Sequence, residues 1–110
     1  MAHTINATTT TNIVLSRRAG EYSYVRINGT GLKIGHKVKI TSGGTDWTGD
    51  AFEENAAKTF LVARLRHDAK EMTKDPLRPK VVAPAIVQVT VTDAATMDTA
   101  TEDISVVIIT

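Results

Sequence analysis

A stretch of regular alternation near the end of the chain constrains the fold more than any other feature. Residues 85–92 read Ala-Ile-Val-Gln-Val-Thr-Val-Thr, so alanine and three valines share one side while the other side is mostly polar. A period of two is typical of a β-strand with one buried face, and β-branched residues suit that geometry. A single strand cannot bury this face alone, so the rest of the chain must supply further strands.

Composition indicates one globular domain with an ordinary surface. The chain has 110 residues, of which 42% are hydrophobic and 23% charged, and its net charge is +1. So small a charge disfavours nucleic acid and anionic membranes as partners. The absence of cysteine excludes a disulfide framework, a zinc knuckle and a thiol nucleophile. We expect a polar, Thr-rich arm over residues 1–12, with no secretion signal, and a folded domain over 13–110.

Alternation predicts several other short strands, separated by turn signals. They are expected at 13–15, 22–28, 37–41 and 104–109, with turns or loops at 28–35, 42–46, 73–80 and 93–99. Segment 53–72 fits either a helix or a strand over 59–66. The strand is favoured because the other elements have a period of two, with one helical turn allowed near 67–72.

Two sets of residues are candidates for contact with a partner. Tyr22, Tyr24 and Arg26 share the outward face of strand 22–28, and tyrosine and arginine are enriched in protein interfaces. Cross-strand pairing on a solvated sheet is the alternative interpretation. The second set lies in the arm, which is expected to pack on a neighbouring subunit or on its own domain. The predicted partner-binding residues are Ile5, Thr8, Thr9, Thr10, Thr11, Tyr22, Tyr24 and Arg26.

Trp47, the only tryptophan, has two interpretations. It either fills the core or forms a stacking platform for a ligand such as a sugar, together with Asp46 and Asp50. The acidic residues around it do not have the spacing of an EF-hand, so no metal or other cofactor is expected. The three histidines are scattered, without a serine or an acid at a recognisable spacing, so no enzymatic activity is expected.

Read from end to end, the chain shows a pattern of glycines and apolar residues at Ile27-Asn28-Gly29-Thr30-Gly31-Leu32, Gly35, Val38-Lys39-Ile40, Thr59 to Leu65, Val87 to Val91, and Ile104 to Val107. In this pattern it resembles an immunoglobulin-like antiparallel β-sandwich of about seven strands, and in particular the IPT/TIG family. The resemblance covers roughly residues 12–109. The chain departs from the family by lacking the usual opening prolines and by a charged insertion over 67–79. The resemblance implies a binding or structural module without shared catalytic residues.

Two functions follow as expectations. The first is a non-enzymatic structural protein of a phage virion, such as a capsid decoration protein or a tail or fibre module, assembled in the host cytoplasm. Its partners would be a major capsid protein, a tail protein or further copies of itself, with neither nucleic acid nor membrane involved. The second is a surface module that binds carbohydrate or another ligand.

Overall fold

The computed structural model describes residues 3–18, 21–68 and 81–109, and within these ranges the chain forms strands and loops without a helix. The all-β prediction is therefore confirmed. The strands are β1 (Thr4–Ile5), β2 (Val14–Ser16), β3 (Tyr22–Thr30), β4 (His36–Ser42), β5 (Thr45–Glu54), β6 (Phe60–His67), β7 (Val82–Asp93) and β8 (Thr99–Ile109).

All eight strands belong to one mixed sheet with the order β1-β3-β6-β5-β4-β7-β8-β2. Neighbouring strands are antiparallel except for β2 and β8, which pair in parallel with Val14 opposite Val107. The expected antiparallel sandwich has about seven strands in two sheets. The observed pairing is instead continuous across eight strands, and one of the pairs is parallel.

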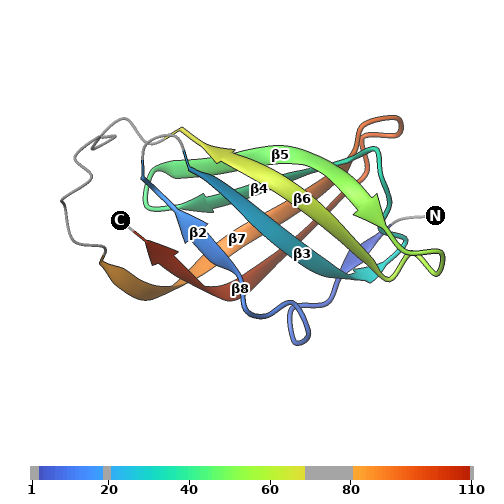
Figure 1. Ribbon diagram of the computed structural model, residues 1–110. Coiled ribbons are helices and arrows are strands. Elements are labelled where there is room, and N and C mark those ends of the chain that lie inside the picture. Colours follow the sequence, from blue (N-terminus) through green and yellow to red (C-terminus); the bar gives the residue numbers. More distant parts are fainter. Residues whose placement is uncertain (1–2, 19–20, 69–80, 110) are drawn as a thin grey trace.

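The sheet curls into a half-barrel, so that its two ends approach one another (Figure 1). Strands β1 and β2 both lie in the gap between β3 and β8: β1 pairs with β3, and β2 pairs with β8. Each also packs beside the strand across the gap, and the backbone N–H of Ser16 donates to Oγ of Ser23 at 2.9 Å. The beginning of the chain therefore fills the seam of the half-barrel.

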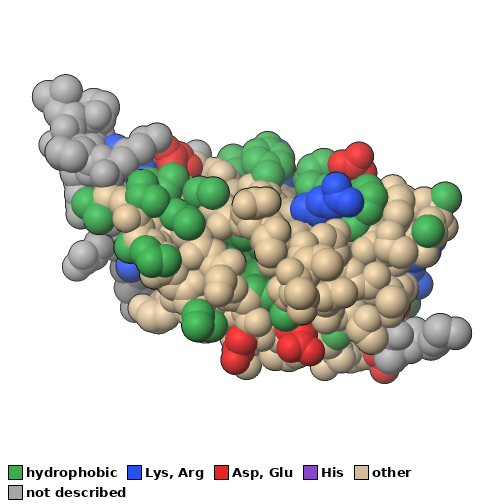
Figure 2. Space-filling view, turned by 90° about the horizontal axis from the view of Figure 1, so that it is seen from below, with side chains coloured by type: hydrophobic (Ala, Val, Ile, Leu, Met, Phe, Trp, Pro, Cys, Tyr) green, Lys and Arg blue, Asp and Glu red, His purple; other side chains and the backbone are tan. Residues whose placement is uncertain are grey.

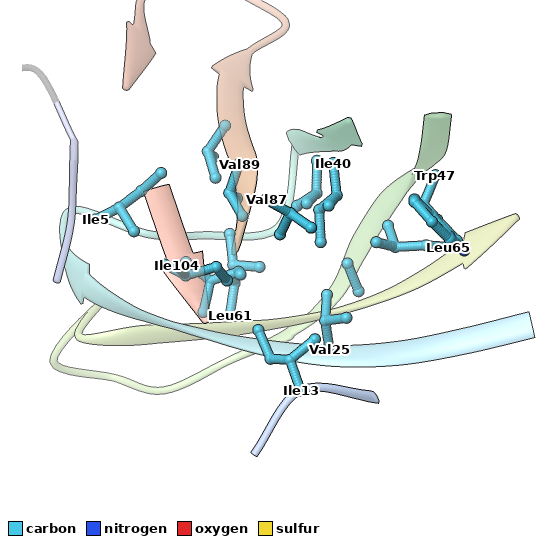
Figure 3. Close-up of a cluster of buried hydrophobic side chains, with 14 of the residues drawn as sticks. Ile5, Ile13, Val25, Ile40, Trp47, Leu61, Leu65, Val87, Val89 and Ile104 are labelled. Carbon is cyan, nitrogen blue, oxygen red and sulfur yellow. The ribbon is translucent and has the colours of Figure 1, made fainter. Parts of the chain in front are cut away.

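The core lies inside the curl and is built by the inward residues of the alternating strands (Figure 3). Of the predicted inward residues of β3, β4, β6 and β7, Ala85 is partly buried and packs against the core. The others are buried: Val25, Ile27, Val38, Ile40, Leu61, Ala63, Leu65, Val87, Val89 and Val91. Burial of a large aliphatic side chain contributes about 1.5–3 kcal/mol, so this set supplies the main stabilisation of the fold.

Strand β6 resolves the ambiguity of segment 53–72. Residues Phe60–His67 form a strand that pairs with β3 on one side and β5 on the other, as the preferred interpretation predicts. Residues 69–72 of the allowed helical turn, and the whole loop predicted at 73–80, lie outside the described residues.

Other boundaries differ from the predictions. The loop expected at 42–46 is a tight turn at Gly43 and Gly44, which adopt φ angles of 54° and 81°, and β5 starts directly after it. Strand β7 begins at Val82 and includes Pro84. Proline is tolerated there because, among the described residues, this part of β7 pairs with β8 alone and has an open edge towards β4.

Hydrophobic side chains gather on the outer surface where β2 and β8 end and β7 begins (Figure 2). Val14, Val82 and Ile86 are 46%, 61% and 73% exposed there, and Ile109 pairs with Val82. The last strand carries apolar residues on both faces, since residues 104–109 read Ile-Ser-Val-Val-Ile-Ile. Its inner residues, Ile104 and Val106, lie in the core.

Candidate functional site

The outer face of β3 presents the three side chains that the sequence placed there. Tyr22 and Tyr24 are 48% and 62% exposed, and Arg26 is also exposed. Their inward neighbours, Ser23 and Val25, are buried. The predicted orientation of this strand is therefore confirmed.

Strand register places arginines of β6 beside these tyrosines. Tyr22 is opposite Arg66 and Tyr24 is opposite Arg64. The guanidinium of Arg64 reaches diagonally to lie 4.7 Å from the centroid of the Tyr22 ring, whereas Arg26 lies 4.0 Å from that of Phe60. Cation–π contacts of this kind hold the arginine side chains against the sheet.

Strand β5 adds a third aromatic residue through a β-bulge. Its pairing with β6 shifts between Ala51 and Glu53, which leaves Phe52 as the extra residue. Phe52 is 52% exposed and meets the Tyr24 ring edge-on, with the ring centroids 6.2 Å apart. Bulges commonly redirect a side chain in this way.

Together these side chains border an open groove of about 650 Å³. It is lined by Tyr22, Tyr24, Gly49, Asp50, Phe52, Arg64 and Arg66. We call the outer surface formed by Tyr22, Tyr24, Arg26, Phe52, Arg64 and Arg66 the aromatic–arginine face. Sequence alternation placed Arg64 and Arg66 outward on their strand, but the bulge that exposes Phe52 has no signal in the sequence.

The charges on this face are unbalanced. Among the described residues, no carboxylate forms an ion pair with Arg26, Arg64 or Arg66. Asp50, at the edge of the groove, instead pairs with Lys37 of β4 at 3.0 Å. Glu53 is exposed next to Phe52 and has no ion-pair partner within the described part of the chain. Positive charge with unused hydrogen-bond donors therefore predominates on this face.

The described part of the N-terminal arm lies against its own domain. Ile5 is 7% exposed and belongs to the core, and Thr10 is 1% exposed, with its hydroxyl donating to the carbonyl of Asn6 at 2.6 Å. Ile5 and Thr10 are thus internal contacts, which corrects their assignment to a partner surface. Thr8, Thr9 and Thr11 are exposed.

The residues of the predicted ligand platform point in different directions. Trp47 is fully buried, and its Nε1–H donates to the carbonyl of Ser16 at 2.9 Å, which confirms the core interpretation. Asp46, which accepts a hydrogen bond from the Thr41 hydroxyl, and Asp50, which lines the outer groove, both lie on the opposite, outer face. The structure therefore does not assemble the platform, because neighbouring residues of β5 alternate between the two faces.

Two buried histidines meet where the arm crosses the end of the half-barrel. The rings of His3 and His36 have centroids 4.3 Å apart, and Nε2 of His3 lies 2.5 Å from the carbonyl oxygen of Val91, to which it must donate. Nε2 of His36 lies 3.6 Å from Asp93. Burial lowers the pKa of His36, and the adjacent His3 lowers it further, while Asp93 opposes both.

Each of the three histidines is buried and contacts a residue distant in sequence. The third one, His67, is also buried, with Nε2 lying 2.7 Å from the carbonyl oxygen of Arg18. Across residues 3–18, 21–68 and 81–109, no group of three or more histidine, aspartate or glutamate side chains is arranged to hold a metal ion.

Comparisons with protein-family models, with curated proteins and with solved structures give no match for this chain. A search of the described residues for a helix long and apolar enough to cross a bilayer also finds none.

Proposed function

We propose that this protein is a non-enzymatic assembly protein that docks on neighbouring protein subunits through its aromatic–arginine face. The observation that carries the proposal is the cluster of three exposed aromatic side chains interleaved with arginines on one face of the sheet. Tyrosine and arginine are typical of the few interface residues whose truncation costs about 2 kcal/mol or more in binding.

The rigidity of the face supports docking. Its side chains stand on three neighbouring strands of one sheet, and the cation–π and edge-on ring contacts restrict their rotamers before a partner arrives. Side chains that are already restricted lose less conformational entropy on binding. The exposed arm residues Thr8, Thr9 and Thr11 are proposed as further contacts.

We place this assembly in a virion, with the protein acting as a capsid decoration protein or as a tail or fibre module. What supports this is the small β-rich domain, its cysteine-free composition and its resemblance to IPT/TIG-type modules. The immunoglobulin-like sandwich itself remains part of the proposal, supported by the spacing of glycines and apolar residues.

Particle incorporation tests the proposal. The gene would be expressed together with the other structural genes of its genome, and particles would be purified on a density gradient. The double variant Tyr24→Ala/Phe52→Ala is expected to lose at least tenfold in incorporation, because it removes the ring pair at the centre of the face. The matched control is Ile34→Ala, which truncates a hydrophobic side chain as exposed as that of Phe52 (52%) that is not one of the residues of this face.

Loss of docking can be distinguished from loss of folding, because every substituted side chain is exposed and thermal unfolding shows whether each variant is folded. Normal incorporation of the folded double variant would contradict docking through this face. Absence of the wild-type protein from every particle would contradict the assembly function.

A carbohydrate-binding module is the second candidate. The observation that favours it is the groove itself, in which Tyr22, Tyr24 and Phe52 adjoin Asp50. Aromatic rings can stack on a sugar, and a carboxylate beside them can accept hydrogen bonds from its hydroxyl groups. A glycan array with the wild type and Tyr24→Ala tests it, and binding that is absent or unchanged by the substitution would exclude this candidate.

A further inference from the structure

We propose that the surface occupying the aromatic–arginine face is an acidic segment of a protein, whose carboxylates are bound by Arg26, Arg64 and Arg66. The inference rests on the proposed docking function and names the chemistry of its partner. It follows from the unused donors, the shape and the mixed charge of the face.

The three arginines have guanidinium N–H groups that are available to donate hydrogen bonds. Within the described residues, Arg64 and Arg66 have no hydrogen-bond or ion-pair partner, and Arg26 uses only its Nε–H, towards the side chain of Asn28 at 3.2 Å. Stacking of Arg26 on Phe60 and of Arg64 on Tyr22 leaves the edges of both guanidinium groups available. A guanidinium presents paired N–H groups that match the two oxygens of a carboxylate.

The groove accommodates the rest of an acidic side chain. Tyr22, Tyr24 and Phe52 border it with apolar rings, and its volume of about 650 Å³ can take several side chains. The methylene groups of a glutamate would pack on these rings while its carboxylate reaches Arg64 or Arg66. Contact with the rings places the charge pair in a partly desolvated setting, where it gains more than on an open surface.

The acids on the same surface argue for a protein segment over a continuous polyanion. Asp50 stands at the groove and Glu53 lies beside Phe52. A phosphate backbone, with charges at short regular intervals, would meet these carboxylates, whereas a peptide can place its carboxylates opposite the arginines alone. The net charge of +1 also provides little general attraction for nucleic acid.

The test is a titration of the full-length, ¹⁵N-labelled protein, followed by NMR at low salt. The probes are terminally blocked hexaglutamate, hexathymidylate and, as a charge control, hexalysine. Hexaglutamate is expected to shift amide signals of β3, β5 and β6 around the groove, and 0.5 M salt should abolish the effect. Arg64→Gln/Arg66→Gln should weaken this binding at least tenfold.

The matched control is Lys33→Gln/Lys39→Gln, which removes two positive charges that are already paired with Asp93 and Asp46 and should bind hexaglutamate as the wild type does. The proposal is overturned if hexaglutamate does not bind, if it binds elsewhere, if both double variants weaken binding equally, or if hexathymidylate binds more tightly. If one of these results were found while Tyr24→Ala/Phe52→Ala still prevented incorporation into particles, the proposed docking function would stand. Only the inference that the partner segment is acidic would be contradicted.

Discussion

Gly49 of β5 lies so close to the backbone of β6 that a side chain at this position would clash with it. A Cβ atom built there would lie 1.9 Å from the carbonyl oxygen of Arg64 on the paired strand, far inside van der Waals contact. The obstacle is backbone, so it cannot rotate away as the end of a side chain could. Glycine at this point lets the backbones of β5 and β6 approach each other.

We therefore predict that Gly49→Ala lowers the free energy of unfolding by about 3 kcal/mol, in the range of substitutions that force a backbone clash. Thr48→Ala, an exposed substitution next to it, should change stability by no more than about 0.5 kcal/mol. Urea unfolding measures both. Equal stability of Gly49→Ala and wild type would show that the two strands can separate at this point without cost.

His36 makes the stability of the fold dependent on pH. Its pKa in the folded protein lies below the ordinary value of about 6.5, chiefly because of burial and then because of His3. The unfolded chain therefore takes up the proton at a higher pH than the folded one. The free energy of unfolding should be fully developed above about pH 7.5 and should fall as the pH drops through 6.5 towards the folded pKa.

Urea unfolding at pH 7.5, 6.5 and 5.5 checks the sign of this dependence. His36→Gln removes the titrating group and should flatten the fall in this range, even if its stability at pH 7.5 is lower. A wild-type protein that is equally or more stable at pH 5.5 than at pH 7.5 would contradict the prediction.

Strand β1 contributes to the fold through one side chain. Ile5 is buried in the core, whereas Thr4 points outward and shares a hydrogen bond with the Thr30 hydroxyl. Ile5→Ala should therefore cost about 2–5 kcal/mol, typical of a truncation that leaves a cavity, and Thr4→Ala about 1 kcal/mol or less. Thermal unfolding compares them. If Ile5→Ala left stability unchanged but reduced particle incorporation, Ile5 would be a partner contact after all.

The strands that the sequence predicts well are those whose burial is visible in local alternation. Residues 85–92, 37–41 and 59–66 each carry apolar side chains at every second position. The first two ranges lie within β7 and β4, and the third matches β6 from Phe60 onwards. Strand β5 is not predicted in this way because Thr45–Glu54 has only two buried hydrophobic side chains, Trp47 and Ala51, among polar residues and a glycine. Strand β1 is too short to leave a pattern, and its pairing with β3 joins residues about 25 positions apart.

The candidate site also combines residues that local alternation predicts with residues that it does not predict. Tyr22, Tyr24 and Arg26 were placed outward by alternation within one strand, which is local information. Their neighbours Phe52 and Arg64 depend on strand order and on a bulge, both set by long-range pairing that no local pattern encodes. The single mixed sheet escaped prediction for the same reason, since spacing within strands does not reveal which strands pair.

The seam of the half-barrel offers a test of the whole molecule. Val14 and Val107 are paired residues of the parallel strands β2 and β8, and the protein has no native cysteine. Val14→Cys/Val107→Cys should form an intramolecular disulfide under mild oxidation and raise the free energy of unfolding by about 2–4 kcal/mol over the reduced form. Val14→Cys/Thr101→Cys, far out of register on the same strand, should not close. If both cysteine pairs formed the disulfide equally well, the result would contradict the observed register.

The parallel pairing of β2 with β8 also means that the seam can close only after β8 has been synthesised. Ile13 and Leu15 leave the ribosome about 90 residues before the strand beside which they pack. These side chains stay exposed to water or to chaperones until β8 has emerged. A nascent chain that stops before β8 would therefore keep its seam open and leave Ile13 and Leu15 as exposed hydrophobic residues.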